Sequence, residues 1–422
     1  MKNSDTNLTD DSLNVKDFTR YQCVKVTDSV SFAKVMVNPQ ADHALFPGWN
    51  RLGDFFMDKF TRRFKMSDLS VAEIANSIRS ADAEYLQKAQ QHTGRLVMPP
   101  RALGRMHDIS EKLCSIQNTL TPRVDNKAIL VFAGDHGVLE EGVSAFPQVV
   151  SKEMIRCFLK GGAGINAFGR QVNAEVKIVD AGIASELDFQ DIMGHEDLWE
   201  YNLGPGTANF ARGPAMTPEQ AEQSILNGFV AANRLLESGV EIIGTGDMGI
   251  GNTTPAAAIG AVIGNTSVQS MVGRGTGVDD QGLENKIAAI EKGIGVNNPD
   301  PEDALDVLGK LGGFEIGGIA GCILACAYNS IPVVIDGFIS TAGALIAYKL
   351  NSSVLDYMFA GHNSEEPGHS TMLNYLGLQP ILNLDMRLGE GTGGALAMGI
   401  IDSASRMFRE VHTFEQAGVS ED

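Results

Sequence analysis

The feature that most constrains the fold of this chain is a series of short apolar runs that begins after Asn126. These runs are rich in β-branched residues and alternate with helical segments. Short, mostly apolar runs are typical of strands that are buried on both faces of a parallel sheet. We therefore expect strands at residues 128–133, 176–179, 240–243, 332–335 and 380–384.

The segment between the second and third runs indicates how the strands are connected. Thr217, Pro218 and Gln220 form the pattern of a helix start, with an N-cap, a proline in the first turn and a capping box. Apolar residues then recur on one face until Gly239 ends the helix. Parallel strands need such crossovers, so we expect an α/β fold with a doubly wound, Rossmann-like parallel sheet over residues 126–400.

The chain before the sheet has a different texture. Two amphipathic stretches, 71–91 and 103–116, are separated by two prolines that cannot lie inside a helix. We expect a small helical domain here, over residues 66–125. Residues 1–65 are polar at first and then carry scattered aromatic and basic residues, and we treat them as an appended segment of unknown role.

Charge and cysteine content exclude several classes of protein. The 33 Lys and Arg against 52 Asp and Glu give a net charge of −19, which argues against nucleic-acid or anionic membrane partners. The N-terminus does not have the pattern of a secretory signal, and the most apolar stretch, 316–335, is interrupted by polar residues and a proline. The five cysteines are sparse and have no CxxC spacing, so we expect a reducing compartment, the cytoplasm.

An aspartate follows each of the expected strands closely. In open parallel sheets ligands bind beyond the carboxyl ends of the strands, so we expect these carboxylates to converge on the site. They suit metal chelation or hydrogen bonds from the hydroxyls of a ribose, although any one of them could simply cap a turn. The residues are Asp135, Asp180, Asp247, Asp336 and Asp385.

The run GTGDMGIGNTTPAAAIG (244–260) follows an expected strand and opens a helix. We expect Thr253 or Thr254 to cap this helix and Pro255 to be its first residue, with backbone N–H groups free to hold a phosphate. The run also contains the spacing of a dinucleotide fingerprint, which would indicate an oxidoreductase. The late helix start and the lack of an acid about 20 residues beyond Gly249 argue against that alternative.

Two further glycine runs carry charged residues. Residues 273–286 supply Arg274 and Lys286 as cations for a phosphate, or else form a surface loop. Residues 388–401 place Glu390 just before a helix that is apolar on all sides and therefore buried. Burial and a helix N-terminus have opposite effects on a carboxyl pKa, so Glu390 could be a general base or a simple helix cap. The loop histidines His136, His362 and His369 have no metal-binding spacing and are expected to be satisfied in their loops.

Taken together, these segments resemble the nicotinate-nucleotide:dimethylbenzimidazole phosphoribosyltransferases of cobalamin nucleotide-loop assembly. The resemblance runs from about Asp68 to the end of the chain. It is carried by FAGDHGVLEEGVSAFPQ (132–148), GDMGIGNTTPAAA (246–258), GRGTGVDD (273–280), GGFEIGGIAG (312–321), PVVIDGFISTAGALIA (332–347), GHNSEEPGH (361–369) and LGEGTGGALA (388–397).

The resemblance implies a homodimer with a parallel-sheet domain and a small helical domain built from both chain ends, which residues 401–422 would complete. It implies transfer of phosphoribose from nicotinate mononucleotide to 5,6-dimethylbenzimidazole, giving α-ribazole 5′-phosphate and nicotinate. The pyridinium leaving group departs as a neutral ring, so we expect neither a metal nor a cofactor. Adenine or phenolic acceptors, or a nucleotide-binding subunit without activity, are the alternatives within the same family.

The resemblance also assigns residues. The family's base is the glutamate of its LGEGTG motif, here Glu390. The acceptor pocket would be lined by Phe146, Met154, Met248 and Leu388, and the phosphoribose would lie near Gly249, Asn252, Thr253, Gly275, Lys286 and Asp336. Two features depart from the family: Asp247 stands where many relatives have the longer Glu, which puts a role as second carboxylate in doubt, and residues 1–65 have no counterpart.

Overall fold

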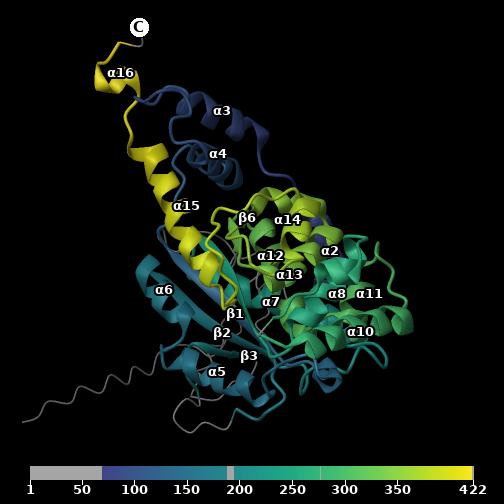
Figure 1. Cartoon of the computed structure of the whole chain (residues 1–422). Helices are drawn as coiled ribbons and strands as arrows, with labels where there is room; N and C mark the ends of the chain where they lie inside the picture. The colour runs from purple at the N-terminus through teal and green to yellow at the C-terminus, as the bar shows by residue number, and fades with distance from the viewer. Residues whose placement is uncertain (1–68, 188–193, 276, 421–422) are drawn as a thin grey trace, which may run out of the picture. The chain divides into compact units, whose positions relative to one another are not determined.

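A computed structural model of the chain describes residues 69–187, 194–275 and 277–420, and its centre is a six-stranded parallel sheet (Figure 1). The strand order is β3-β2-β1-β4-β5-β6. The order reverses between β1 and β4, which makes their carboxyl ends the switch point where such sheets bind ligands. The strands are β1 Lys127–Gly134, β2 Ala174–Gly182, β3 Leu198–Glu200, β4 Ile242–Met248, β5 Val333–Ile335 and β6 Met358–Ala360.

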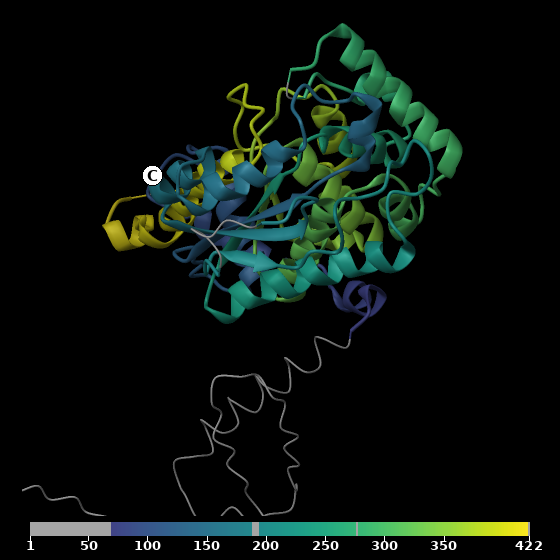
Figure 2. The same cartoon turned by 90° about the horizontal axis from the view of Figure 1, so that it is seen from below.

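β1 forms the middle of the sheet and is buried along its whole length. Its residue Ile129 lies opposite Val176 of β2 on one side and Gly244 of β4 on the other. Helices cover both faces, as Figures 1 and 2 show: α5, α6 and α15 contact one face, and α7, α12 and α13 contact the other. This arrangement confirms the expected doubly wound α/β fold.

The helices begin and end largely where caps and glycines in the sequence indicate. Thr217 caps α7 with a complete capping box, and Pro218 is its first residue, as predicted. The helices are α2 Val71–Ser77, α3 Ala83–Thr93, α4 Arg105–Gln117, α5 Val149–Leu159, α6 Gly164–Val172, α7 Pro218–Glu237, α8 Thr253–Ile263, α9 Val268–Met271, α10 Asp280–Asn297, α11 Ala304–Leu311, α12 Phe314–Tyr328, α13 Phe338–Leu350, α14 His369–Leu376, α15 Thr392–Glu410 and α16 Phe414–Ala417, with 3-10 turns at Gly137–Glu141 and Ser352–Tyr357.

Both ends of the described chain contribute to a small helical unit beside the sheet. α3 and α4 pack together, and α15 contacts α4 (Figure 1). A bridge between Leu96 and Thr413 and a hydrogen bond from Phe414 N–H to Arg95 O at 3.0 Å join the two ends directly. α15 contacts β4 and β5 of the sheet and continues past residue 400 without a break. The division of the chain at that residue therefore stays a prediction. The appended segment 1–65 lies outside the described residues.

Two predictions about elements were wrong in detail. The expected helix at 71–91 is two helices, because the chain extends at Ile78 and Asp82 then accepts hydrogen bonds from Glu84 and Tyr85 N–H to start α3. The cap of α8 is Asn252, and Thr253 is already helical.

A third prediction was wrong outright, because residues 380–384 form no strand. Leu382 makes a single bridge to His362, and Leu384 is 56% exposed. Asp385 is consequently exposed in a left-handed turn and does not join the other acids. The sixth strand is instead β6, which the sequence analysis missed together with β3. Among the described residues no helix is both long and apolar enough to cross a bilayer.

Candidate active site

A pocket of 460 Å³ lies at the carboxyl ends of the strands near the switch point. Its lining includes Phe146, Asp247, Asn252, Thr253, Gly275 and Leu388, all of which were predicted as site residues. The rest of the lining comes from the loops after β5 and β6 and from the segment before Glu390: Gly337, Phe338, Ile339, His362, Ser364, Glu366, Arg387 and Gly389. The structure thus brings together three glycine runs that are far apart in the sequence.

The other predicted site residues, all of them described, are not part of this lining. Met154 on α5 and Met248 at the end of β4 are partly buried and pack against the core. Gly249 contacts the end of β1 so closely that a Cβ atom there would lie 2.1 Å from Gly134 O. A glycine is therefore required at this point for the loop after β4 to rest on β1.

One end of the pocket has the composition of a phosphate site. Lys286 Nζ, on α10, donates to Thr253 Oγ1 at 2.8 Å and to Gly273 O at 3.0 Å. Burial lowers the pKa of the Lys286 ammonium to about 8, and the charge of Glu366 opposes that shift. Thr253 stands in the first turn of α8, where the helix dipole favours an anion. The expected free N–H groups are largely engaged, because Thr254 N–H donates to Gly251 O, Ala256 N–H donates to Asn252 O, and Pro255 has no N–H. Arg387 Nη1 donates to Gly275 O at 3.0 Å, and this cation is part of the lining itself.

Two of the predicted acids hold backbone turns. Asp135 Oδ2 accepts a hydrogen bond from Ala184 N–H at 2.9 Å. Asp180 Oδ1 accepts from Gly182 and Ile183 N–H at 3.1 and 2.9 Å. For these two aspartates the simpler interpretation, a turn cap, is the better one.

Asp336 fixes the start of α15. Its Oδ2 accepts from Gly391 N–H at 3.2 Å, and its Oδ1 accepts from Gly394 N–H at 2.9 Å. Burial raises the pKa of the Asp336 carboxyl, and His362, whose Nε2 lies 3.8 Å from Oδ1, acts in the opposite direction. Both oxygens are thus directed at backbone groups beside Glu390.

Asp247 differs from Asp135, Asp180 and Asp336 because it lines the pocket. Its Oδ2 accepts from Asn252 Nδ2 at 2.9 Å, whereas its buried Oδ1 has no hydrogen-bond partner among the described residues. Burial, helped by the charges of Asp336, Glu315 and Glu390, raises the pKa of Asp247 to about 8. The group is therefore mostly protonated at neutral pH in the unliganded protein.

Glu390 is buried, as the sequence predicted, in a loop that crosses the end of β4. Its N–H donates to Asp247 O at 3.3 Å, and its backbone is left-handed with φ +64°, an uncommon conformation for a residue with a side chain. Its Oε2 accepts from Ile165 N–H at 3.0 Å, so the carboxylate faces the N-terminus of α6 and not that of its own helix. Burial raises the pKa of Glu390, the bond from Ile165 lowers it, and the charge of Asp336 adds to the increase, so that the balance is a raised pKa. A base poised nearer neutrality results.

A buried ion pair lies next to the carboxyl end of β1. His136 Nε2 lies 2.9 Å from Glu315 Oε1, and both side chains are almost fully buried. Burial lowers the pKa of His136, but the charge of Glu315, the hydrogen bond to Glu315 and the charge of Asp135 together outweigh it and leave the pKa raised. The prediction that the loop histidines are satisfied thus holds for His136, which pairs with Glu315, and for His369, both of whose ring nitrogens have partners. It is wrong for His362, which lines the pocket and whose buried Nδ1 has no hydrogen-bond partner among the described residues.

Several lining residues were missed by the sequence analysis. Ser364 and Glu366 belong to the GHNSEEPGH segment, and Arg387 immediately precedes the LGEGTG motif. The available signal was their position inside or next to motifs already singled out. Nothing local in the sequence shows that residues 361–369 face the start of α8.

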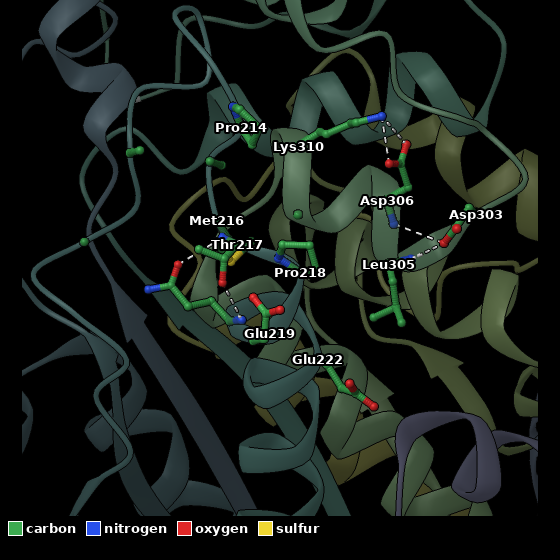
Figure 3. A pocket seen from close by; sticks show the side chains of 15 residues that line it. Pro214, Met216, Thr217, Pro218, Glu219, Glu222, Asp303, Leu305, Asp306 and Lys310 are labelled. Carbon is green, nitrogen blue, oxygen red and sulfur yellow. Dashed lines mark hydrogen bonds and ion pairs between the residues drawn. The ribbon is translucent and has the colours of Figure 1, made fainter.

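A larger pocket of 820 Å³ lies between the start of α7 and α11, and none of the predicted site residues lines it (Figure 3). Several of its polar groups are engaged in helix caps and one ion pair, and Glu219 and Glu222 also line it. Asp303 accepts from Leu305 and Asp306 N–H, Thr217 and Gln220 form the capping box of α7, and Lys310 pairs with Asp306 at 2.7 Å. This pocket lacks the unpaired polar groups of the one at the strand ends, within the part of the chain that the structure describes.

Comparisons with known proteins agree with the geometry. Residues 78–419 match a family model described as "Phosphoribosyltransferase". A nicotinate-nucleotide–dimethylbenzimidazole phosphoribosyltransferase of Geobacter sulfurreducens is 49% identical over 351 residues, which cover 83% of this chain and 98% of that protein. The one of Geotalea uraniireducens is 49% identical over 349 residues, with the same coverage. A crystal structure of the enzyme of that name from Thermus thermophilus superposes with a TM-score of 0.76 at 41% identity, covering 81% of this chain and 100% of the other.

Proposed function

The chain belongs to the nicotinate-nucleotide–dimethylbenzimidazole phosphoribosyltransferase family, and we propose that it performs this reaction in the 460 Å³ pocket with Glu390 as general base. Phosphoribose passes from nicotinate mononucleotide to 5,6-dimethylbenzimidazole, giving α-ribazole 5′-phosphate and nicotinate. The single observation that carries the site assignment is the position of Glu390: a buried carboxylate with a raised pKa, next to a pocket whose other end is built for phosphate.

The donor's phosphate binds at the start of α8. Lys286, Thr253, Asn252 and the backbone around Gly249 and Gly275 supply cationic and N–H or O–H donors there. The pyridinium of the donor carries a positive charge, so its binding lowers the cost of ionising Asp247, whose carboxyl lines the same pocket. Asp247 is thus a second carboxylate that stabilises the donor's charge before the glycosidic bond breaks.

The acceptor then loses one proton as it forms one bond. A ring nitrogen of dimethylbenzimidazole attacks C1′ of the ribose, the bond from C1′ to the nicotinate nitrogen breaks, and its electron pair remains on the departing ring. The N–H proton of the acceptor's other nitrogen passes to Glu390. The Ile165 N–H and the loop that Asp336 holds keep the Glu390 carboxylate in one orientation during this step.

The acceptor's pocket is apolar and open at its edge. Phe146 is 48% exposed and Leu388 is 58% exposed, and the partly buried Met154 and Met248 pack against the core. Large apolar side chains exposed at a site favour a covering surface, and we place a second copy of the chain there, so that the enzyme is a homodimer. The solution mass, measured by light scattering, would be that of one chain if this were wrong.

Neither a metal nor a cofactor enters the reaction as written, because the leaving group departs as a neutral ring. Its participants are small molecules, and we place it in the cytoplasm, without nucleic-acid or membrane partners. Adenine or phenolic bases are weaker candidates for the acceptor, because the relatives compared above carry dimethylbenzimidazole in their names.

Product analysis with and without Glu390 tests the proposal. The purified protein is incubated with nicotinate mononucleotide and dimethylbenzimidazole, and α-ribazole 5′-phosphate is identified by mass and by its anomeric NMR signal. Glu390→Gln preserves the shape of the side chain but cannot take the proton, so kcat should fall by about 10²–10⁴ while donor binding is nearly unchanged.

The dependence on the acceptor adds a sharper readout. A more acidic benzimidazole needs a base less, so it should recover part of the lost rate in Glu390→Gln. The matched control is Glu365→Gln, since Glu365 is exposed. A Glu390→Gln enzyme that turns over at the wild-type rate would make Asp247 the next candidate for the base.

A further inference from the structure

The acid that the family resemblance places near the ribose is already occupied. Both oxygens of Asp336 accept backbone N–H groups of the segment 391–394, and the side chain is only 1% exposed. Each oxygen could accept a second hydrogen bond, but Asp336 is not part of the pocket lining and is therefore poorly placed to receive one from a sugar hydroxyl. Another acceptor in the pocket should therefore recognise the ribose, whichever role Asp336 has.

The segment after β6 offers a carboxylate of the required kind. Glu366 lines the pocket, is only 7% exposed, and its Oε2 has no hydrogen-bond partner among the described residues. A buried carboxylate oxygen without a donor is unfavourable, so its retention at this place indicates that a ligand supplies the donor. The loop histidine of this segment, His369, is in contrast fully used: it accepts from Ser364 N–H at 2.8 Å and contacts Thr341 Oγ1 at 2.9 Å.

The backbone around Glu366 is held in place. Asn363 N–H donates to Leu382 O at 2.8 Å, and Glu365 N–H donates to Met386 O at 3.1 Å. Glu366 N–H donates to Ser364 Oγ at 3.4 Å. The backbone that carries Glu366 is therefore fixed by contacts with the segment 382–386 and with Ser364.

Glu366 also lies beside the proposed phosphate site. A Cβ atom on Gly273 would lie 2.1 Å from Glu366 Oε2, and the carbonyl oxygen of Gly273 accepts the bond from Lys286 Nζ at 3.0 Å. The same glycine thus contacts both the carboxylate and the cation. In a ribose 5-phosphate the hydroxyls are separated from the phosphate by only a few bonds, so a donor anchored at Lys286 brings its hydroxyls to this region.

We propose that Glu366 accepts a hydrogen bond from a hydroxyl of the donor's ribose and thereby selects ribonucleotide over deoxyribonucleotide donors. This inference rests on the proposed function, because it takes the donor to be nicotinate mononucleotide. A hydroxyl donating to a charged acceptor in a buried site discriminates strongly, since the analogue without the hydroxyl leaves the carboxylate unpaired.

The test compares donors on three enzymes. Wild type, Glu366→Ala and Glu365→Ala are assayed for kcat/KM with nicotinate mononucleotide and with its 2′-deoxy and 3′-deoxy analogues. Wild type and Glu365→Ala should prefer the ribonucleotide over at least one deoxy donor by about 10- to 100-fold, the range of one hydrogen bond to a charged group. Glu366→Ala should lose that preference, chiefly because its kcat/KM with the ribonucleotide falls.

Glu366→Gln keeps the shape of the side chain and one acceptor oxygen, so it should retain part of the preference. It also provides a second test if the alanine variant does not fold. The proposal is overturned if Glu366→Ala loses the same factor with all three donors, or if wild type does not distinguish them. Either of those results leaves the proposed function intact. Absence of turnover with any donor in the wild-type enzyme would overturn the proposed function instead.

Discussion

At the scale of single residues, Asp247 has the clearest electrostatic signature in the site. Its carboxyl is buried among Asp336, Glu315 and Glu390, and its pKa is raised from 3.8 to about 8. An acid with a raised pKa in the folded state binds its proton more tightly there than in the unfolded chain. The free energy of unfolding should therefore fall as pH rises from about 4 to about 8, and should be unaffected by this group below that window.

Replacing Asp247 with Asn should remove this dependence. The asparagine side chain cannot ionise and can still pair with Asn252, so in the unliganded enzyme the variant should gain about 1–3 kcal/mol over wild type at pH 8 and much less at pH 5. Urea unfolding at the two pH values measures the difference. Asp385→Asn, at an exposed aspartate, is the matched control and should show no such trend. A gain of equal size at both pH values would contradict the assigned pKa.

At the scale of elements, the start of α15 connects stability to chemistry. Asp336 accepts two of the N–H groups that a helix N-terminus leaves unpaired, and one of them is the N–H of the residue after Glu390. Asp336→Asn removes one acceptor, which should cost about 1 kcal/mol of stability and should lower kcat through a displaced Glu390, with KM for the donor little changed.

Thr217→Ala provides the comparison for that variant. It removes the exposed cap of α7 and should cost a similar free energy without a change in kcat. Unfolding curves and steady-state kinetics of both variants separate the two effects. If Asp336→Asn raised KM for the donor instead of lowering kcat, a direct contact of Asp336 with the ribose would be the better assignment.

The strands show which elements a sequence can reveal. β1 and β5 were predicted because their apolar runs are buried on both faces. β2 and β4 were predicted with the wrong bounds: β2 is only partly buried in its first half, and β4 starts at Ile242 and continues to Met248, into the glycine run that was expected to follow it. β3 and β6 are three residues long and contain no β-branched residue, whereas β5 is equally short but consists of Val, Val and Ile. Residues 380–384 had the composition of a strand but lie at the surface, where only the fold could have excluded them.

The site was predictable to the same extent. Glu390, Thr253 and Lys286 lie in glycine runs whose local chemistry is visible in the sequence, and the structure places all of them around the strand ends. That Asp336 supports a helix and Glu366 faces the pocket follows from contacts between distant segments. No spacing in the sequence encodes such contacts.

At the scale of the whole molecule, the requirement for metal is the simplest test of the reaction type. The carboxylates at the strand ends are assigned to backbone groups, to hydroxyls and to a cationic ring, and the leaving group needs no electrophilic assistance. Turnover should therefore stay within about twofold of its starting rate after chelation and dialysis. A tenfold loss would correspond to about 1.4 kcal/mol of lost transition-state stabilisation and is not expected. A strict dependence on Mg²⁺ would reopen the question of a pyrophosphate-activated donor.

The N-terminal segment is the second whole-molecule question. The relatives from Geobacter sulfurreducens and Geotalea uraniireducens are matched over 98% of their own length by 83% of this chain. We therefore expect a chain starting at Lys65 to fold and to keep kcat within about twofold of the full chain. Circular dichroism and the product assay measure both properties. Loss of soluble protein on truncation would show that the segment is a structural part of the enzyme.

The contact between Gly249 and the end of β1 has a consequence for how this sequence can diverge. Any side chain at 249 would have to displace the carbonyl of Gly134, so two segments far apart in the sequence can change only in concert. Phe146 and Leu388, at the open edge of the acceptor pocket, have no such restriction. Single substitutions at the acceptor pocket can thus change which base is accepted. A substitution at 249, in the part of the site that holds the donor, would need a second change at the end of β1.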